Sequence, residues 1–304
     1  MVSVPGRHRF GPRQAVWLFV GIAVAVLAAP IIVNSVIEWA ARRQMHRFEA
    51  RAESILAAEL FRDSTPSYEP LLDSARLRRS ELRAAPLAIF IALPEAFAEI
   101  AAGVGQHEHK PRLGAWGMRR DIALTLLTAH ISEATGKASK LATHLERLGD
   151  STRAARYFKL SYGLARMTGD LNSAGLALEW LAACYPCDTI RQDTAIAYLT
   201  RTRDLYARAQ AWDALARVET AIGVRRHWSR DYVGALQWYL AALETCDAWG
   251  VDSTSVLGDI EQLRGATGEA EFERLLRATA DEERVQSLLN GLDSSQSAGQ
   301  NGAM

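Results

Sequence analysis

The chain has 304 residues, of which 49% are hydrophobic and 23% charged, and its 35 basic side chains balance its 35 acidic ones. This apolar content excludes a disordered chain, and the zero net charge argues against a protein that binds nucleic acid through an overall basic surface. Three cysteines are too few for a fold built on a disulfide framework. The length allows one large domain or two small ones.

The first element in chain order is a membrane-like segment. Residues 1–14 form a basic tail, and residues 15–37 carry no charge. As a helix, this uncharged segment spans roughly 34 Å, enough to cross a hydrocarbon core of about 30 Å. Trp17 and Trp39 stand near its two ends, where interfacial aromatic anchors occur. The sequence therefore predicts a single transmembrane helix over 15–37, with both tryptophans at the membrane interfaces and the lipid bilayer as a partner.

A cleaved signal peptide is the alternative for this segment. The exit sequence Val26-Leu27-Ala28 resembles a cleavage site. The apolar run continues past it as far as Ile37, which favours an anchor that stays in the membrane. The tail is short and easily retained, so we expect the N-terminus inside. The protein would then be a single-pass protein of the inner (cytoplasmic) membrane, with its bulk on the periplasmic side.

Residues 38–117 are expected to form a helical stalk and an apolar helical region. The stalk carries hydrophobic residues at helical spacing, from Met45 to Leu60, and continues the membrane helix. The apolar stretch 84–105 is interpreted as a buried helix pair, or alternatively as a segment that lies on the bilayer. Four glycines and a proline between 103 and 117 predict a loop and a domain boundary.

Residues 118–290 show helix patterns at short intervals, and no strand pattern occurs anywhere in the chain. Gly149-Asp150 and Gly169-Asp170 combine a left-handed helix end with a following N-cap, which predicts tight turns between helices. Residues 291–304 are polar and are expected to be a disordered tail. The predicted fold class is all-α: an N-terminal transmembrane helix followed by a solenoid of α-helical hairpins.

Two helix pairs in this region share a spacing. Ala142 is followed by Ala154 and Phe158, and Gly223 by Ala235 and Tyr239. In each pair a small residue on the first helix precedes a small residue and an aromatic residue on the second. Small residues let antiparallel helices approach closely, and the aromatic ring fills the adjoining groove.

This pattern resembles the tetratricopeptide-repeat family, and the match is closest at residues 231–242. The resemblance implies a right-handed solenoid of helix hairpins whose concave face binds proteins or peptides. The second-helix alanines 154, 195 and 235 are 41 and 40 residues apart, whereas the family's repeat is 34 residues long. The sequence thus indicates a helical-repeat solenoid more firmly than it indicates this particular family.

Cys184 and Cys187 flank a Tyr-Pro pair, a spacing that is typical of redox dithiols. A catalytic dithiol requires an activated thiolate at a helix N-terminus, but this pair follows a helix, where the helix dipole raises a thiol's pKa. A loop disulfide in an exported domain and two unpaired small residues are the other interpretations.

No catalytic motif is found, and we expect no cofactor, no metal and no small-molecule substrate. His107 and His109 stand two residues apart in a glycine-rich stretch, without a second ligand pair at a recognised spacing. The main hypothesis is that the protein is not an enzyme. A membrane-bound hydrolase or redox protein that uses Glu95, Glu99 and these histidines, or the cysteine pair, is the alternative.

The six tryptophans at 116, 180, 212, 228, 238 and 249 are expected to be mostly core residues. Trp228, Trp238 and Trp249, with Tyr239, are the candidate interaction surface, because exposed aromatic side chains anchor protein interfaces. The resulting functional hypothesis is a membrane-anchored scaffold or assembly subunit that binds other membrane or periplasmic proteins. An exported chaperone-like module that binds client proteins is a further alternative.

Overall fold

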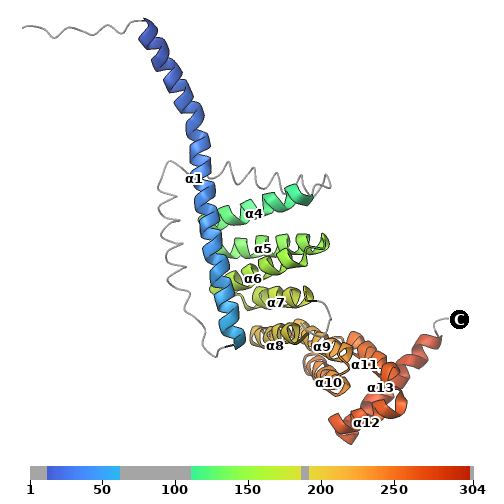
Figure 1. Ribbon diagram of the computed structural model, residues 1–304. Coiled ribbons are helices and arrows are strands. Elements are labelled where there is room, and N and C mark those ends of the chain that lie inside the picture. The colour runs from blue at the N-terminus through green and yellow to red at the C-terminus, as the bar shows by residue number, and fades with distance from the viewer. Residues whose placement is uncertain (1–11, 62–110, 186–191, 302–304) are drawn as a thin grey trace, which may run out of the picture. The chain divides into compact units, whose positions relative to one another are not determined.

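The computed structural model describes the backbone of residues 12–61, 111–185 and 192–301. Side chains are described at 34–60, 114–185, 192–290 and 292. Every regular element in these ranges is an α-helix, and the fold is all-α (Figure 1). The helices are α1 (Pro12–Phe61), α4 (Pro111–Leu127), α5 (Ile131–Arg147), α6 (Ser151–Thr168), α7 (Leu171–Ala183), α8 (Gln192–Ala209), α9 (Trp212–Trp228), α10 (Tyr232–Trp249), α11 (Thr254–Thr267), α12 (Glu269–Thr279) and α13 (Glu282–Asn301).

The chain divides into two compact units. Unit 1 comprises residues 1–47 and 69–130, and unit 2 comprises residues 48–68 and 131–304. Helix α1 contributes its first part to unit 1 and its last part to unit 2, while α4 belongs to unit 1 and α5–α13 to unit 2.

No helix in the described part of the chain is long and apolar enough to cross a membrane. The expected membrane segment 15–37 lies within the helical backbone of α1. Its side chains up to residue 33, including Trp17, are outside the described residues, as is the apolar stretch 84–105.

Two expectations about helix boundaries are wrong. Residues 111–117, which were expected in a loop, form the start of α4, and Gly114 and Gly117 are buried within it. Their spacing of three residues places both glycines on one side of the helix, and neither ends it. The tail is not disordered throughout, because α13 extends to Asn301 and buries Leu292.

The helix ends of unit 2 follow the predicted turn chemistry. Gly149 and Gly169 both have φ of +76°, the left-handed conformation that glycine adopts without steric cost. The carboxylates of Asp150, Asp170 and Asp231 each accept a hydrogen bond from the backbone N–H three residues later, at 3.0 Å. These caps confirm the turns that were predicted after Gly149 and Gly169.

The helices of unit 2 pack in a repeated, sequential way. From α5 to α10, each helix packs against the next one in the chain, and α10 also contacts α11 and α12 (Figure 1). The predicted small-and-aromatic packing is present, since a Cβ on Gly223 would lie 2.5 Å from Cε1 of Tyr239. Unit 2 is therefore a helical-repeat-like assembly, and its C-terminal core contains Tyr239, Ile260 and Phe272.

The predicted amphipathic stripe of α1 is present, and its last part is built into unit 2. Phe48, Ala52 and Ile55 are fully buried. Ala52 lies against Gly163 of α6, where an added Cβ would overlap the Cβ and Cα atoms of Ala52. The helix continues beyond residue 37 as predicted, but residues 48–61 pack as a member of the repeat unit rather than as an isolated stalk.

Candidate interaction surface

The α9–α10 hairpin of unit 2 carries a pair of stacked tryptophans. Trp212 is the first residue of α9 and Trp249 the last residue of α10, so the antiparallel hairpin places both at the same end. Their ring centroids are 3.9 Å apart and the ring planes differ by 6°. Trp249 is 55% exposed although the stack covers one of its faces. A pair of stacked indole rings with one ring exposed offers an apolar surface that can anchor a partner protein.

Trp238, a half-buried residue of α10, lies about 16 Å along the helix from Trp249. It precedes Trp249 by eleven residues, close to three helical turns, so the two side chains lie on the same side of the helix. The guanidinium carbon of Arg203, on α8, lies 5.8 Å from the centroid of the Trp238 ring. We refer to Trp212, Trp238, Trp249 and Arg203 as the tryptophan surface.

A buried carboxylate holds Arg203 in place. The side chain of Glu219, on α9, is 1% exposed and pairs with Arg203 at 2.8 Å. Its other oxygen accepts a hydrogen bond from the hydroxyl of Thr245 on α10, also at 2.8 Å. The Glu219 carboxylate thereby links α8, α9 and α10. These links fix the position of Arg203 relative to the other residues of the tryptophan surface.

The other two members of the predicted surface lie elsewhere. Trp228 is 69% exposed, but it ends α9 and stands about 24 Å along that helix from Trp212. Val233, the second residue of α10, is also exposed. The assignment of Tyr239 to the surface is wrong, because its side chain is fully buried and fills the groove beside Gly223.

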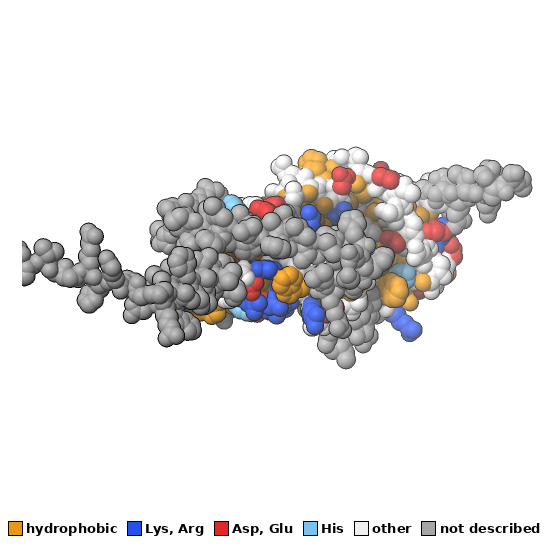
Figure 2. Space-filling model, turned by 90° about the horizontal axis from the view of Figure 1, so that it is seen from above, with side chains coloured by type: hydrophobic (Ala, Val, Ile, Leu, Met, Phe, Trp, Pro, Cys, Tyr) orange, Lys and Arg blue, Asp and Glu red, His pale blue; other side chains and the backbone are white. Residues whose placement is uncertain are grey.

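The expectation that most of the six tryptophans are core residues is also wrong. Trp116, Trp180, Trp228 and Trp249 are exposed, and the remaining two are half-buried. Sequence reasoning missed Trp212 and Arg203 as members of the surface. Their positions depend on contacts between different helices, 37 residues apart for Trp212 with Trp249 and 35 for Arg203 with Trp238, and no local pattern signals such contacts. The visible face in Figure 2 carries hydrophobic, basic and acidic side chains side by side, as expected from the zero net charge.

A second face of unit 2, formed by α6 and α8, is occupied by the end of α1. The Glu59 side chain is 1% exposed, and its carboxylate pairs with Arg166 at 2.8 Å and with Arg201 at 3.0 Å. The hydroxyl of Tyr162 donates a further hydrogen bond to Glu59. Nearer the middle of α1, Glu49 pairs with an arginine of α6, Arg156, at 2.5 Å. We call the Glu59, Tyr162, Arg166 and Arg201 group the Glu59 cluster.

The Glu59 cluster favours the ionised carboxylate. Burial alone would raise the pKa of Glu59, but hydrogen bonds from Arg166 and Tyr162, the charge of Arg166 and a hydrogen bond from Arg201 outweigh it. The pKa of Glu59 therefore lies below its ordinary value of 4.5. Burial and the hydrogen bond to Glu59 raise the pKa of Tyr162, so this phenol remains protonated and continues to donate.

The environment of Cys184 disfavours a thiolate. Cys184 follows the last residue of α7 and is half-buried. Burial, together with the charge of Glu146, raises the pKa of its thiol to about 11. A reactive cysteine requires the opposite shift. Cys187 lies outside the described residues, so a disulfide between Cys184 and Cys187 stays a prediction.

Within the part of the chain that the structure describes, no group of three or more His, Cys, Asp or Glu side chains could hold a metal ion. His107, His109, Glu95 and Glu99 lie outside that part. Trp39, the second predicted membrane-interface anchor, is 60% exposed, and the guanidinium carbon of Arg43 lies 5.2 Å from the centroid of its ring.

No protein-family model matches the chain, and no curated protein sequence matches it. Among solved structures, the chain is similar to the crystal structure of BtubC (BKLC) from P. vanneervenii, with 17% sequence identity and a TM-score of 0.47. That similarity covers 74% of this chain and 93% of the BtubC chain.

Proposed function

We propose that this protein is a membrane-anchored helical-repeat scaffold that binds other proteins of a membrane complex. The observation that carries the proposal is the tryptophan surface, where Trp249 is exposed yet held rigidly by Trp212. Large exposed aromatic side chains lose contact with water when a partner covers them, and they dominate the free energy of many protein interfaces. No small-molecule substrate and no nucleic acid enter this function.

The membrane anchor is part of the same proposal. The uncharged segment 15–37 belongs to α1, whose helical backbone is continuous from Pro12 to Phe61. Residues 48–61 of this helix pack within unit 2 and are fastened there by the Glu59 cluster. An anchor that shares a helix with the repeat unit holds that unit at the inner membrane. The N-terminus would lie inside, with the repeats on the periplasmic side.

The repeat is proposed to be of the tetratricopeptide type. The close packing of Gly223 against Tyr239 and the full burial of Ala154, Phe158 and Ala235 support this assignment. In such a solenoid the hairpins present continuous surfaces to partner proteins, so a tryptophan surface that spans α8, α9 and α10 lies where binding is expected.

The test is affinity purification of the full-length protein from detergent-solubilised membranes. We expect a stoichiometric set of membrane proteins to accompany the wild-type chain and to be lost with Trp249→Ala. Trp180→Ala is the matched control, because Trp180 is also an exposed tryptophan of unit 2 but belongs to α7 and stacks on Phe158 at 6.2 Å. This control should retain the partners.

Two results would contradict the proposal. If the wild-type chain is recovered alone, it is not a stable subunit of a complex. If Trp249→Ala and Trp180→Ala retain the same partners in the same amounts, the tryptophan surface is not the binding site. Extraction of membranes with alkaline carbonate tests the anchor separately, because an integral protein stays in the pellet.

A further inference from the structure

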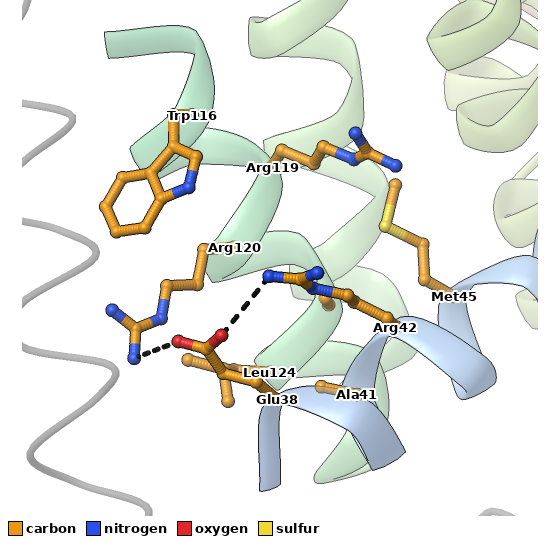
Figure 3. A pocket seen from close by; sticks show the side chains of 9 residues that line it. Glu38, Ala41, Arg42, Met45, Trp116, Arg119, Arg120 and Leu124 are labelled. Atoms are coloured by element: carbon orange, nitrogen blue, oxygen red, sulfur yellow. Dashed lines mark hydrogen bonds and ion pairs between the residues drawn. The ribbon is translucent and has the colours of Figure 1, made fainter. Parts of the chain in front are cut away.

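Unit 1 contains a small cavity between α1 and α4. Its volume is about 270 Å³, and its walls include Glu38, Arg42 and Met45 of α1 and Trp116, Arg119 and Arg120 of α4 (Figure 3). Pockets for drug-sized ligands typically measure roughly 300–1,000 Å³. A cavity of this size with charged walls fits a small ionic group better than a large organic molecule.

The described side chains of unit 1 carry more positive than negative charge. Residues 34–47 and 114–130 of unit 1 contain five arginines but only two acidic residues, Glu38 and Asp121. The carboxylate of Glu38 lies between two guanidinium groups, 3.2 Å from Arg42 and 2.8 Å from Arg120 (Figure 3). One carboxylate cannot neutralise both, so the cavity walls keep an excess of positive charge.

Arg119 and Arg120 have N–H groups that could donate hydrogen bonds to a ligand. The Nε–H of Arg120 is buried and donates to no partner among the described residues, although the Nη2 group of the same side chain donates to Glu38 and Asn34. Arg119 is exposed and makes no ion pair within that part of the chain. An anion with several acceptor oxygens would satisfy both groups, and phosphate is the anion that arginine recognises best through paired N–H donors.

Two exposed tryptophans, each beside an arginine, belong to the helices that line the cavity. Trp116 is 48% exposed, and the guanidinium carbon of Arg120 lies 5.4 Å from its ring centroid. Trp39 and Arg43 form a second such pair on α1. Exposed tryptophans beside arginines occur where a protein surface meets lipid headgroups, because indole rings prefer that layer and arginines bind its phosphates.

The position along α1 places the cavity at headgroup depth. Glu38 directly follows the uncharged segment, and Arg42 comes five residues after Ile37, about 7.5 Å further along the helix. The polar layer on each side of a bilayer is of the order of 5–8 Å thick. This step rests on the membrane anchor that the proposed function includes.

We propose that this cavity binds the phosphate of an anionic phospholipid headgroup, with Arg42, Arg119 and Arg120 as its ligands and Trp116 beside the glycerol backbone. The bound headgroup would fasten α4 to the membrane surface next to α1. Free inorganic phosphate offers the same oxygens, so the experiment must separate the two sources.

The experiment is native mass spectrometry of the full-length protein in detergent, titrated with phosphatidylglycerol, with phosphatidylcholine or with inorganic phosphate. We expect one phosphatidylglycerol molecule to bind about tenfold more tightly than phosphatidylcholine, while inorganic phosphate competes poorly. Arg42→Gln and Arg119→Gln should each weaken phosphatidylglycerol binding about fivefold. Arg274→Gln is the control, because Arg274 of α12 is an arginine with a 75% exposed side chain that does not line the cavity. It should leave binding unchanged.

Equal binding of the two lipids would overturn the proposal, as would equal losses in the cavity variants and in Arg274→Gln. If inorganic phosphate occupies the cavity as tightly as phosphatidylglycerol and depends on the same arginines, the ligand is a soluble phosphate and the lipid assignment is wrong. Arg42 and Arg119 are both exposed, so neither substitution is expected to impair folding. Carbonate extraction of the same variants is a separate readout: failure of the anchor releases the wild-type protein from membranes, whereas failure of the lipid site does not.

Discussion

The face of α6 and α8 that holds the end of α1 and the surface of the α9–α10 hairpin belong to the same unit, but their chemistry differs. The first is covered by the chain itself and is held by the buried Glu59 cluster. The second exposes Trp249, which stacks on the half-buried Trp212. Buried ion pairs together with apolar packing hold the end of α1, whereas the hairpin presents an aromatic ring to solvent.

Under the proposed function, the two faces of unit 2 have separate tasks. A buried ion cluster is costly unless every partner is in place, so it specifies a single position for α1. An exposed stack of tryptophans imposes no such condition, because it gains free energy from any well-fitting apolar surface. We therefore expect that damage to the first face reduces stability and that damage to the second reduces binding.

The largest effect is expected for Glu59→Gln. This substitution removes the negative charge between Arg166 and Arg201 and should lower the free energy of unfolding by about 3 kcal/mol, because it leaves buried guanidinium groups uncompensated. Chemical denaturation of the full-length protein in detergent measures this loss. Glu53→Gln, at an exposed position of the same helix, should change stability by less than about 0.5 kcal/mol.

The lowered pKa of Glu59 predicts that the stability of the protein depends on pH. The pKa of Glu59 is lowered in the folded protein, so its stabilisation is fully present above the ordinary value of 4.5 and is lost as the pH falls through the lower folded value. The wild-type protein should therefore lose stability below about pH 4.5 more steeply than Glu59→Gln. Parallel curves for the two proteins would show that the cluster does not carry this charge.

An intermediate effect is expected at the close contact between α1 and α6. Gly163→Ala places a Cβ 2.6 Å from Cα of Ala52, which is backbone and cannot turn aside, so the helices must separate. We expect a loss of about 1–2 kcal/mol in the free energy of unfolding. Gly136→Ala is the matched control in α5, where an added Cβ meets no atom within 4 Å. It should stabilise the protein by about 0.5–1 kcal/mol, because alanine favours a helix interior. Equal effects at the two positions would contradict the packing of α1 on α6.

Local patterns in the sequence predicted much of the repeat unit. Glycine followed by aspartate at 149–150 and 169–170 specifies a helix end and the next N-cap within a few residues, so the turns were correct. The hydrophobic period between 45 and 60 likewise gave the buried side of α1. The glycines at 114 and 117 were misread as a loop, because a glycine that lets helices pack closely has the same local signature as one that ends a helix.

The Glu59 cluster and the stacked tryptophans could not be predicted in this way. Glu59 meets Arg166 and Arg201 across 107 and 142 residues of sequence, and no periodic pattern joins positions so far apart. Trp228 and Trp249 were named as candidate surface residues because exposed aromatic side chains anchor interfaces, and both are exposed. Adjacent Trp238 and Tyr239 were assigned together, yet neighbouring residues on a helix point about 100° apart, and only one of them faces the core.

The smallest effect on stability is expected at the turns between helices, where residues adopt positive φ. The turns that bound α6 use Gly149 and Gly169 in the left-handed conformation, whereas the α9–α10 hairpin is entered through Gln210 at φ +56° and turns at Arg230 at φ +63°. A residue with a Cβ is strained there, so Gln210→Gly should raise the free energy of unfolding by about 0.5–1 kcal/mol. Gly169→Ala is the converse control: no neighbouring atom lies within 4 Å of an added Cβ, so only backbone strain acts, and a loss of about 1 kcal/mol is expected. Thermal unfolding of both variants measures these shifts.

The effect of Gln210→Gly on partner binding separates two roles of the backbone strain at Gln210. If binding is unchanged, the strain only lowers stability. If binding is weaker, the strain positions the α9–α10 hairpin for its partner.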